Sequence, residues 1–393
     1  MTRVLVALLV YNGRTFVPRA IESLERMVSG SSNDVDVIVF DDASPEPGWS
    51  AELEAICQRH LVGYYRSPRN LGIPRNMNLG LLRAEAAGYD HVILCNSDVV
   101  VPVNLADSMV AVADADPRIA SVTAWSNNAS IFSIPNEDGE RWLTDVGAVD
   151  QVSATLAAEF ADEPLDIPVG MGFCLSVRVA AIREVGLMDP VFGRGYCEEV
   201  DWCRRALALG WRNVLARNTY VFHMGSATTL LAGLLAPGER TVQVNESIID
   251  QRHPRYRDET ATWVSTGEMA TNVRRALDRL VCEQARTHGY VLEATWLRRR
   301  PATGYSPDLV RVTVNPDGPG GSDALVEASC RGWRTQVPIG SDGIVAGVSR
   351  FLGVEPSEIR ILDHGSVASA IAAAAGSLGV KVVTAARYPS RVA

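Results

Sequence analysis

The residues best suited to chemistry in this sequence are acids that stand where short apolar segments end. Asp98 follows the apolar segment 91–95 after two polar residues, Asn96 and Ser97. A carboxylate at such a position can hold a hydrated divalent cation through oxygen, with Asn96 as a neutral neighbour. The alternative is a strand-end turn, with which the nearby Pro102 is compatible.

A second pair of acids, Asp41 and Asp42, ends the apolar segment 35–40. A carboxylate there can bind a ribose or a base, although Asp, Ser and Pro in this stretch also form capped turns. A dinucleotide-binding fold would place an acid here too, but it needs a G-x-G-x-x-G turn after the first strand. The first apolar segment, 4–10, ends instead in YNGR, which disfavours that fold.

Three acids crowd the start of a helix predicted at 199–209, namely Glu198, Glu199 and Asp201. The helix dipole alone favours acids at this end, and the alternative is that one of them is a general base. Mutual repulsion raises at least one of their pKa values, whereas the helix N-terminus opposes that rise. Asp201 lies about 200° from Glu199 on the helix, so the two cannot point at the same spot. Glu198 shares the side of Trp202.

His223 ends an apolar segment, 221–223. A lone histidine is more often a surface or hydrogen-bonded core residue than a metal ligand. Paired with Asp98 it would make a mixed oxygen and nitrogen site. Such a site suits Mn²⁺ or Mg²⁺ better than a structural zinc.

The composition of the 393 residues is that of a globular protein, with 47% hydrophobic and 21% charged residues. The net charge, 37 − 46 = −9, disfavours a nucleic-acid partner. The seven cysteines are odd in number and never spaced as C-x-x-C, so neither a disulfide framework nor a zinc cage is expected. The apolar run at 4–11 is too short for a signal segment or a membrane span. These features favour a cytoplasmic protein.

Short apolar segments alternate with helical patterns in the first half of the chain, which predicts an α/β fold with a mostly parallel sheet between helices. Ligands of such sheets bind outside the carboxyl ends of the strands, where the acids fall. The middle is less regular, with a helix predicted at 153–160 and, at 167–177, a strand with tight turns at Gly170 and Gly172. Strands are predicted at 4–10, 35–40, 63–66, 91–95 and 119–124, and helices from Pro18 and at 51–60, 75–87 and 106–115.

The pattern changes near residue 290, which predicts two domains. The first is expected at 1–285, with a helical extension from about 230, and the second is a small α+β domain at 290–393. Its strands are expected at 310–314, 324–329, 335–339, 359–362 and 380–385, and its helices at 343–352 and 366–378.

Several segments, taken in order over roughly residues 3 to 280, resemble the family 2 inverting glycosyltransferases of the GT-A fold. The most specific is FGRGYCEEVDWC at 192–203, which is similar to the acidic motif FGxGYGEExDxC, with Cys197 in place of the usual Gly. SNNA at 126–129 resembles a loop of polysaccharide-assembly members. The other segments are LVYNG at 9–13, VIVFDDAS at 37–44, RNLG at 69–72, NMNLG at 76–80, NSD at 96–98 as a variant of the DXD motif, VGMGFC at 169–174, VGLMD at 185–189, GWR at 210–212 and VFH at 221–223.

The resemblance implies a role for each matching residue. Val10 and Asp42 would contact the nucleobase, with Asp42 accepting the imino N–H of uracil or thymine. Asp98 would bind the Mn²⁺ or Mg²⁺ that bridges the donor diphosphate, and His223 would be a further ligand. Glu199 would be the catalytic base, where many members carry Asp. The expected nucleotide-binding set also holds Tyr11, Asp41, Asn70, Arg75, Asn96 and Ser97, and the expected acceptor-binding set holds Glu198, Asp201 and Trp202.

The chemistry of inverting transfer agrees with this set. The acceptor hydroxyl needs a proton acceptor, a contribution of ~10²–10⁴ in rate, and the leaving diphosphate needs charge neutralisation by a Lewis acid. Arg75 and Arg194 are candidates for further phosphate contacts, with solvated loop arginines as the alternative.

The expected function is metal-dependent hexosyl transfer from a UDP- or dTDP-sugar. Two alternatives are weaker: a catalytically silent GT-A module that binds nucleotide sugar or glycan as a scaffold, and a nucleotidyltransferase, which would need a Gly-rich basic loop after the first strand. The acceptor would be a glycan, a lipid-linked glycan or a small molecule, and the tail is compatible with a homo-oligomer. The expected location is the cytoplasm, including the inner face of the membrane.

Overall fold

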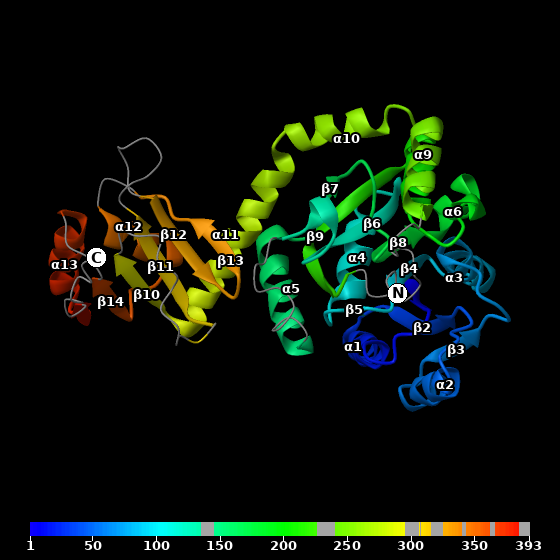
Figure 1. Ribbon diagram of the computed structural model, residues 1–393, viewed down its shortest axis with the longest axis horizontal. Coiled ribbons are helices and arrows are strands. Elements are labelled where there is room, and N and C mark those ends of the chain that lie inside the picture. The colour runs from blue at the N-terminus through cyan, green and yellow to red at the C-terminus, as the bar shows by residue number, and fades with distance from the viewer. Residues whose placement is uncertain are drawn as a thin grey trace, which may run out of the picture. The chain divides into compact units, whose positions relative to one another are not determined.

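The computed structural model describes residues 1–134, 145–225, 240–294, 306, 308–315, 325–339, 343–361 and 366–384. The chain divides into two compact units, and among the described residues the first ends at Thr271 and the second begins at Asn272. Each unit has its own sheet, with helices packed beside it (Figure 1).

The sheet of the first unit has nine strands in the order β3-β2-β1-β4-β8-β6-β9-β5, with β7 paired to β9. The first four strands of this order are parallel, β8 runs antiparallel to both of its neighbours, and β6 is parallel to β9. The α/β fold with a mostly parallel sheet is thereby confirmed. The strands are β1 (Arg3–Val10), β2 (Asp34–Asp41), β3 (Gly63–Arg66), β4 (His91–Asn96), β5 (Val99–Val100), β6 (Ile119–Ser126), β7 (Pro164–Asp166), β8 (Cys174–Arg178) and β9 (Arg212–His223).

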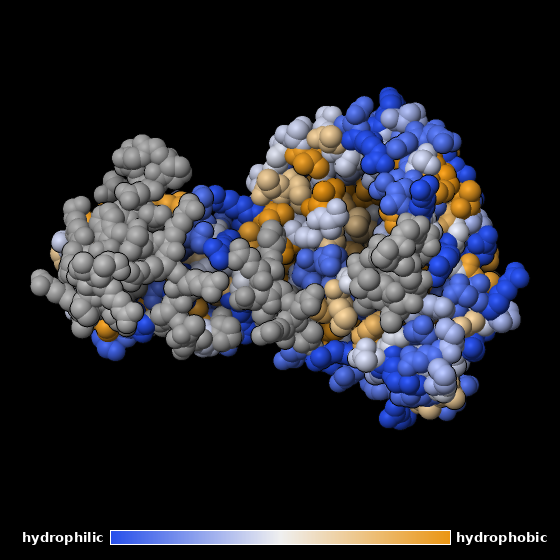
Figure 2. Space-filling view, in the orientation of Figure 1, coloured by the Kyte–Doolittle hydropathy of each residue, from blue (hydrophilic) through white to orange (hydrophobic). Residues whose placement is uncertain are grey.

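The helices of this unit bury apolar faces, as α1 illustrates with Pro18 in its first turn and Ile21 and Leu24 inside. Hydrophobic side chains gather around α10 and β7 in Figure 2, where the indole N–H of Trp263 donates to the carbonyl of Asp166 (3.1 Å). The helices are α1 (Val17–Gly30), α2 (Trp49–Arg59), α3 (Ile73–Ala87), α4 (Leu105–Asp114), α5 (Val146–Phe160), α6 (Val179–Val185), α7 (Glu198–Ala208), α9 (Thr241–Arg252), α10 (Tyr256–Ser265) and the start of α11 (Glu268–His288), with 3₁₀ turns η1 (Ser130–Phe132) and η2 (Pro190–Phe192).

Two predictions in the irregular middle need correction. The strand expected at 167–177 begins only at Cys174, because the preceding glycine segment turns tightly against the core. A Cβ on Gly170 would lie 2.6 Å from Leu175 Cδ1 and 2.9 Å from Thr123 Oγ1. The helix expected at 153–160 begins earlier, where Asp145 caps α5 by accepting from the Gly147 N–H (2.9 Å).

The second unit holds a six-stranded sheet in the order β13-β12-β11-β10-β14-β15. Its central strand, β10, falls where the sequence suggested a boundary and was not predicted. The first described residue of this unit, Asn272, lies within α11. That helix contacts the second sheet, where a guanidinium N–H of Arg274 donates to the carbonyl of Gln336 in β13 (3.0 Å), and it contacts α12, where the Cys282 thiol donates to the carbonyl of Phe351 (3.2 Å). The elements are β10 (Tyr290–Ala294), β11 (Val310–Asn315), β12 (Leu325–Cys330), β13 (Trp333–Gln336), α12 (Ile344–Leu352), β14 (Glu358–Ile361), α13 (Ser366–Leu378) and β15 (Val382–Thr384).

The expected strand ends at 324, 362 and 385 lie outside the described residues. None of the described helices combines the length and apolar character needed to cross a bilayer.

Candidate active site

The carboxyl ends of β1, β2 and β4 meet at one edge of the first sheet. The strand register places Val10 beside Asp41 and Leu9 beside Asn96. The Asp42 N–H donates to the carbonyl of Val10 (2.8 Å), which continues the pairing by one residue. The structure therefore brings together residues that lie 41 − 10 = 31 and 96 − 9 = 87 positions apart in sequence, as parallel strands require.

Asp42 anchors the loop that precedes α3. Its buried carboxylate accepts the backbone N–H groups of Leu71 (2.6 Å) and Gly72 (2.9 Å). Burial raises the pKa of Asp42, the two N–H groups oppose the rise, and the charge of Asp41 adds to it, so the net direction is upward. A carboxylate offers about four lone-pair sites, so two acceptor positions stay open for a ligand N–H.

Asp41, expected to contact the nucleotide, instead shapes the turn after β2. Its side chain is fully buried and accepts the Ser44 N–H (2.9 Å), the Ser50 and Tyr64 hydroxyls (2.9 Å each) and a guanidinium N–H of Arg66 (2.7 Å). Burial would raise the pKa of Asp41, but these hydrogen bonds outweigh it and hold the pKa below its usual value. The side chain of Asp41 is not exposed in this structure, so its ligand contact stays a prediction while its observed role is in the turn.

Asp98 and His223 face each other across a short antiparallel ladder. Val99 in β5 pairs with His223 at the end of β9, and Asp98 Oδ1 lies 3.5 Å from His223 Nε2. His223 Nδ1 lies 2.8 Å from the carbonyl oxygen of Asn128. A carbonyl can only accept, so Nδ1 carries a proton and Nε2 is the ring nitrogen turned toward the carboxylate.

These two side chains fit a divalent cation. Asp98 Oδ1 is buried, and apart from the imidazole 3.5 Å away it has no hydrogen-bond partner among the described residues, which is costly unless a ligand satisfies it. An oxygen and an imidazole nitrogen are donors that Mn²⁺ accepts. The described part of the chain holds no cluster of three or more metal-ligating side chains. The remaining positions would thus fall to phosphate oxygens and water, as is usual for Mg²⁺-type sites that bind substrate phosphates.

Two residues that the sequence did not single out hold His223 in place. The Asn127 side chain donates to the His223 carbonyl and accepts the His223 N–H, both at 2.9 Å. The ring of Phe173 stacks on the imidazole, with centroids 5.1 Å apart and planes 19° apart. Asn127 lies in the SNNA motif and Phe173 in the VGMGFC motif, so both stood in segments that carry the family resemblance, although neither was named as a site residue.

Glu199 lies in the first turn of α7 with its side chain half-buried. A Cβ on Gly172 would lie 3.6 Å from Glu199 Cδ, so the absence of a side chain at Gly172 makes room for the carboxyl group. Burial raises the pKa of Glu199, and backbone hydrogen bonds, including one from Gly172, oppose the rise, so that the pKa stays above its usual value. A carboxylate with a raised pKa is suited to proton transfer near neutral pH.

A family model for glycosyl transferase family 2 matches residues 5–186. These residues form a family 2 glycosyltransferase domain. Glu199 and His223 follow the matched region, so the match does not reach them and their roles stay predictions.

Solved structures that resemble the chain include three in which less than a fifth of the residues are identical. The chain spans less than half of the length of the first and third of them, and no curated protein matches the sequence. They are GalNAc-T7 with UDP, GalNAc and Mn²⁺ (17% identity, TM-score 0.43, 56% of this chain and 44% of that one), the mannosyltransferase PcManGT from Pyrobaculum calidifontis in complex with GDP-Man and Mn²⁺ (14%, 0.42, 73% and 75%), and S. aureus TarS (14%, 0.38, 57% and 37%).

The acceptor-binding set expected for the glycosyltransferase is not available at the surface. Trp202 is fully buried and its indole N–H donates to the Gly186 carbonyl (2.8 Å). Asp201 is 1% exposed and is paired with Arg205 (2.8 Å). The acceptor contacts expected of both residues stay predictions, and both side chains serve the fold in this structure. Glu198 is also buried, and its Oε2 has no hydrogen-bond partner among the described residues.

The remaining candidates of the glycosyltransferase lie around the strand ends with few fixed contacts. Tyr11 and Asn96 are half-buried, Ser97 is buried, and Asn70 is exposed. Arg75 is exposed as well, and its guanidinium donates to the Leu71 carbonyl (3.4 Å), on the loop held by Asp42. Their nucleotide contacts stay predictions.

Proposed function

We propose that this glycosyltransferase moves a hexosyl group from a UDP- or dTDP-sugar to an acceptor hydroxyl with inversion at the anomeric carbon, in a reaction that depends on Mn²⁺ or Mg²⁺. One observation carries the proposal. Gly172 lies against the carboxyl group of Glu199, and the next residue, Phe173, stacks on His223. Two consecutive residues thus contact the two candidate groups: Gly172 contacts the candidate base, and Phe173 contacts a candidate metal ligand.

The chemistry assigned to Glu199 is general-base catalysis. Its carboxylate accepts the proton of the acceptor hydroxyl while the hydroxyl oxygen bonds to the anomeric carbon. The bond from that carbon to the diphosphate oxygen breaks on the opposite face, and its electron pair leaves with the nucleoside diphosphate. One displacement of this kind inverts the anomeric configuration and needs only one carboxylate.

Asp98 and His223 would hold the metal, which neutralises charge on the diphosphate as a Lewis acid when bound. Asn127 and Phe173 keep the imidazole oriented, and Asp98 supplies an otherwise unsatisfied oxygen. The nucleobase would bind at Asp42, whose two open acceptor positions suit the imino N–H of uracil or thymine. The buried Val10, at the end of β1, lies next to Asp42.

A thermal-shift panel of UDP-, dTDP- and GDP-sugars, each with and without Mn²⁺, tests the proposal. A ligand that binds only the folded state raises the melting temperature. We expect stabilisation by a uracil or thymine nucleotide that requires Mn²⁺. Stabilisation by GDP-sugars alone, or with no dependence on metal, would overturn the donor and metal assignments.

Turnover distinguishes an enzyme from a catalytically silent scaffold. The donor found in the panel is incubated with water, small sugars and glycan acceptors, and the anomeric proton of the product is followed by NMR. We expect an anomeric configuration opposite to that of the donor. Retention of configuration would contradict the single-displacement mechanism, and binding without any turnover would favour the scaffold.

A further inference from the structure

The three residues before α7 have an unusual backbone. Gly195, Tyr196 and Cys197 have φ values of +132°, +74° and +74°. Residues with side chains rarely adopt positive φ, because the Cβ approaches the neighbouring carbonyl oxygen. Such a backbone persists only where the surroundings hold it. The segment matters because Glu199 follows it by two residues, so its conformation decides where that carboxyl group points.

A single side chain from another helix holds this segment. Asn245 of α9 places its Nδ2 within hydrogen-bond distance of three carbonyl oxygens, those of Phe192 (3.0 Å), Gly195 (2.7 Å) and Tyr196 (3.0 Å). The Asn245 side chain is buried, at 3% exposure. An amide has two N–H donors, so the three carbonyls share them.

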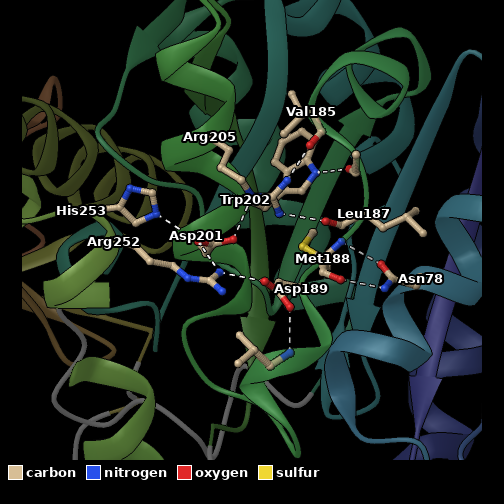
Figure 3. A network of polar contacts seen from close by, with 12 residues as sticks. Asn78, Val185, Leu187, Met188, Asp189, Asp201, Trp202, Arg205, Arg252 and His253 are labelled. Carbon is tan, nitrogen blue, oxygen red and sulfur yellow. Dashed lines mark hydrogen bonds and ion pairs between the residues drawn. The ribbon is translucent and has the colours of Figure 1, made fainter. Parts of the chain in front are cut away.

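Two further residues on the same face of α9, one and two turns after Asn245, hold this helix in place. Ile249 and Arg252 follow Asn245 at i+4 and i+7, and Ile249 is 2% exposed. Arg252 Nη1 bonds to the carboxylates of Asp189 (2.8 Å) and Asp201 (3.3 Å), as Figure 3 shows.

His253 completes this attachment with its Nε2 3.0 Å from Asp201 Oδ1 (Figure 3). α9 therefore contacts η2, the strained segment and α7 along one continuous face.

On its other side the strained segment borders the loop that Asp42 anchors. A Cβ on Gly72 would lie 2.3 Å from the Gly193 carbonyl oxygen, and the Ile73 N–H donates to the carbonyl of Arg194 (3.3 Å). Within the strained segment, a Cβ on Gly195 would lie 2.8 Å from Ile73 Cδ1. The segment therefore contacts both the start of α3, next to the loop held by Asp42, and the amide of Asn245.

We propose that Asn245 is a positioning residue for Glu199, and that α9 therefore belongs to the catalytic apparatus although it lies outside the matched residues 5–186. Asn245 acts through the backbone: its amide fixes three carbonyls and so sets the direction in which α7 begins. The inference rests on the proposed role of Glu199 as the base. It deepens that role, because a general base must point at the proton it accepts, and the amide of Asn245 fixes the backbone that sets the direction of the Glu199 carboxylate.

The first test follows backbone order without any substrate. Asn245→Ala removes the donors, and Asn245→Asp keeps the size of the side chain but turns oxygens toward three carbonyls. Asn104→Ala is the matched control, because Asn104 also bridges by its side chain, to Ser108 (3.0 Å) and Ser153 (2.7 Å), away from α7. We expect hydrogen exchange of the amides from 193 to 199 to accelerate at least tenfold in both Asn245 variants and not in the control.

The second test separates positioning from stability. With the donor identified by the panel, both Asn245 variants should lose at least tenfold in kcat while the donor KM changes less than threefold. Asn104→Ala should keep its kcat even if its melting temperature falls by the same amount. Equal kcat in all variants, or exchange that does not change at 193–199, would overturn the role of Asn245.

A parallel Glu199→Gln variant tells the two hypotheses apart. If Glu199→Gln loses turnover and Asn245→Ala does not, the positioning role fails and the base assignment stands. If Glu199→Gln turns over normally, the base assignment fails, and with it the positioning role, whatever the exchange data show about the Asn245 contact.

Discussion

Nε2 of His223 lies 3.5 Å from Oδ1 of Asp98, and the opposite ring nitrogen is held by the Asn128 carbonyl. Asp98 follows the end of β4 and His223 is the last residue of β9, so the pair connects the ends of these two strands. Since Asp98 Oδ1 has no other hydrogen-bond partner among the described residues, a cation between the two side chains would satisfy it.

Replacing Asp98 by Ala should abolish Mn²⁺-dependent binding of UDP and leave the fold intact. The change removes the only oxygen ligand of the pair. Above the raised pKa of His223 the imidazole is neutral and leaves the buried oxygen unsatisfied, so the melting temperature measured there should stay equal or rise. Calorimetric titration with UDP, with and without Mn²⁺, measures the effect. Asp116→Ala, which loses a surface pair with Arg212, is the control, and metal-dependent UDP binding by Asp98→Ala would remove Asp98 from the site.

Metal affinity should depend on pH through His223. Burial lowers the pKa of His223, but the hydrogen bond and charge of Asp98 and the Asn128 carbonyl outweigh it, so the net pKa lies above the ordinary value of 6.5. A proton and a metal compete for Nε2, so Mn²⁺ binding should weaken as the pH falls through the raised pKa, already above pH 6.5.

Without metal, the folding stability should change with pH in the opposite direction to the metal affinity. The stability that protonated His223 contributes is complete below its unfolded pKa and is lost as the pH rises through the folded value. Mn²⁺ titrations and melting curves between pH 5.5 and 8.5, roughly one unit or more on each side of the ordinary histidine pKa, measure both effects. His223→Gln should flatten them, and identical pH profiles for the two proteins would leave His223 as a structural residue.

Glu199→Gln should lower sugar transfer by at least ~10² and preserve binding of donor and metal, because the amide cannot accept the proton. In the wild type, kcat should fall as the pH drops through the raised pKa of Glu199, above the usual 4.5, since only the carboxylate is active. Initial rates over pH 5–9, roughly from just above that value to well past neutrality, follow this limb.

Glu198→Gln is the matched control for the base. Burial and the charge of Glu199 raise the pKa of Glu198 well above its usual value, which favours the neutral carboxyl group, and a neutral amide of the same shape should replace it with little change. Normal turnover by Glu199→Gln together with lost turnover in Asp201→Asn would move the base to Asp201.

Cys197→Gly should stabilise the first unit by about 0.5–1 kcal/mol. Cys197 has φ +74°, where glycine has no steric cost, and the gain exceeds the extra entropy of glycine in the unfolded chain. Urea denaturation followed by the fluorescence of the buried tryptophans measures the shift. Cys197→Val should destabilise instead, because a β-branched side chain tolerates this φ least, and the opposite order would contradict the strain.

A chain that ends at Thr271 should bind donor and stay monomeric, whereas one that ends at Gly289 should aggregate. The longer chain keeps α11 but lacks the second sheet, so the buried face of the helix is exposed; its members include Ala276, Leu280, Val281 and Ala285. Size-exclusion chromatography and UDP titration compare the two. Failure of the shorter chain to bind UDP would place the second unit within the donor site.

The sequence by itself determined the parts of this protein that depend on local patterns. Continuous apolar runs predicted the central strands because a strand covered on both faces must be apolar throughout, and β1 and β4 begin and end within one residue of the predicted bounds. The order of the motifs predicted the family, and the helical period alone separated the directions of Glu199 and Asp201.

Only the tertiary structure decided which polar residues are free for ligands. Asp41 and Trp202 stand in recognisable motifs, yet burial and partners from distant segments commit both of them to the fold. Three further contacts depend on which strands and helices become neighbours. Asp98 approaches His223, Phe173 stacks on that imidazole, and Asn245 donates hydrogen bonds to three carbonyls. Such contacts join residues far apart in the chain, and no local spacing or composition encodes them.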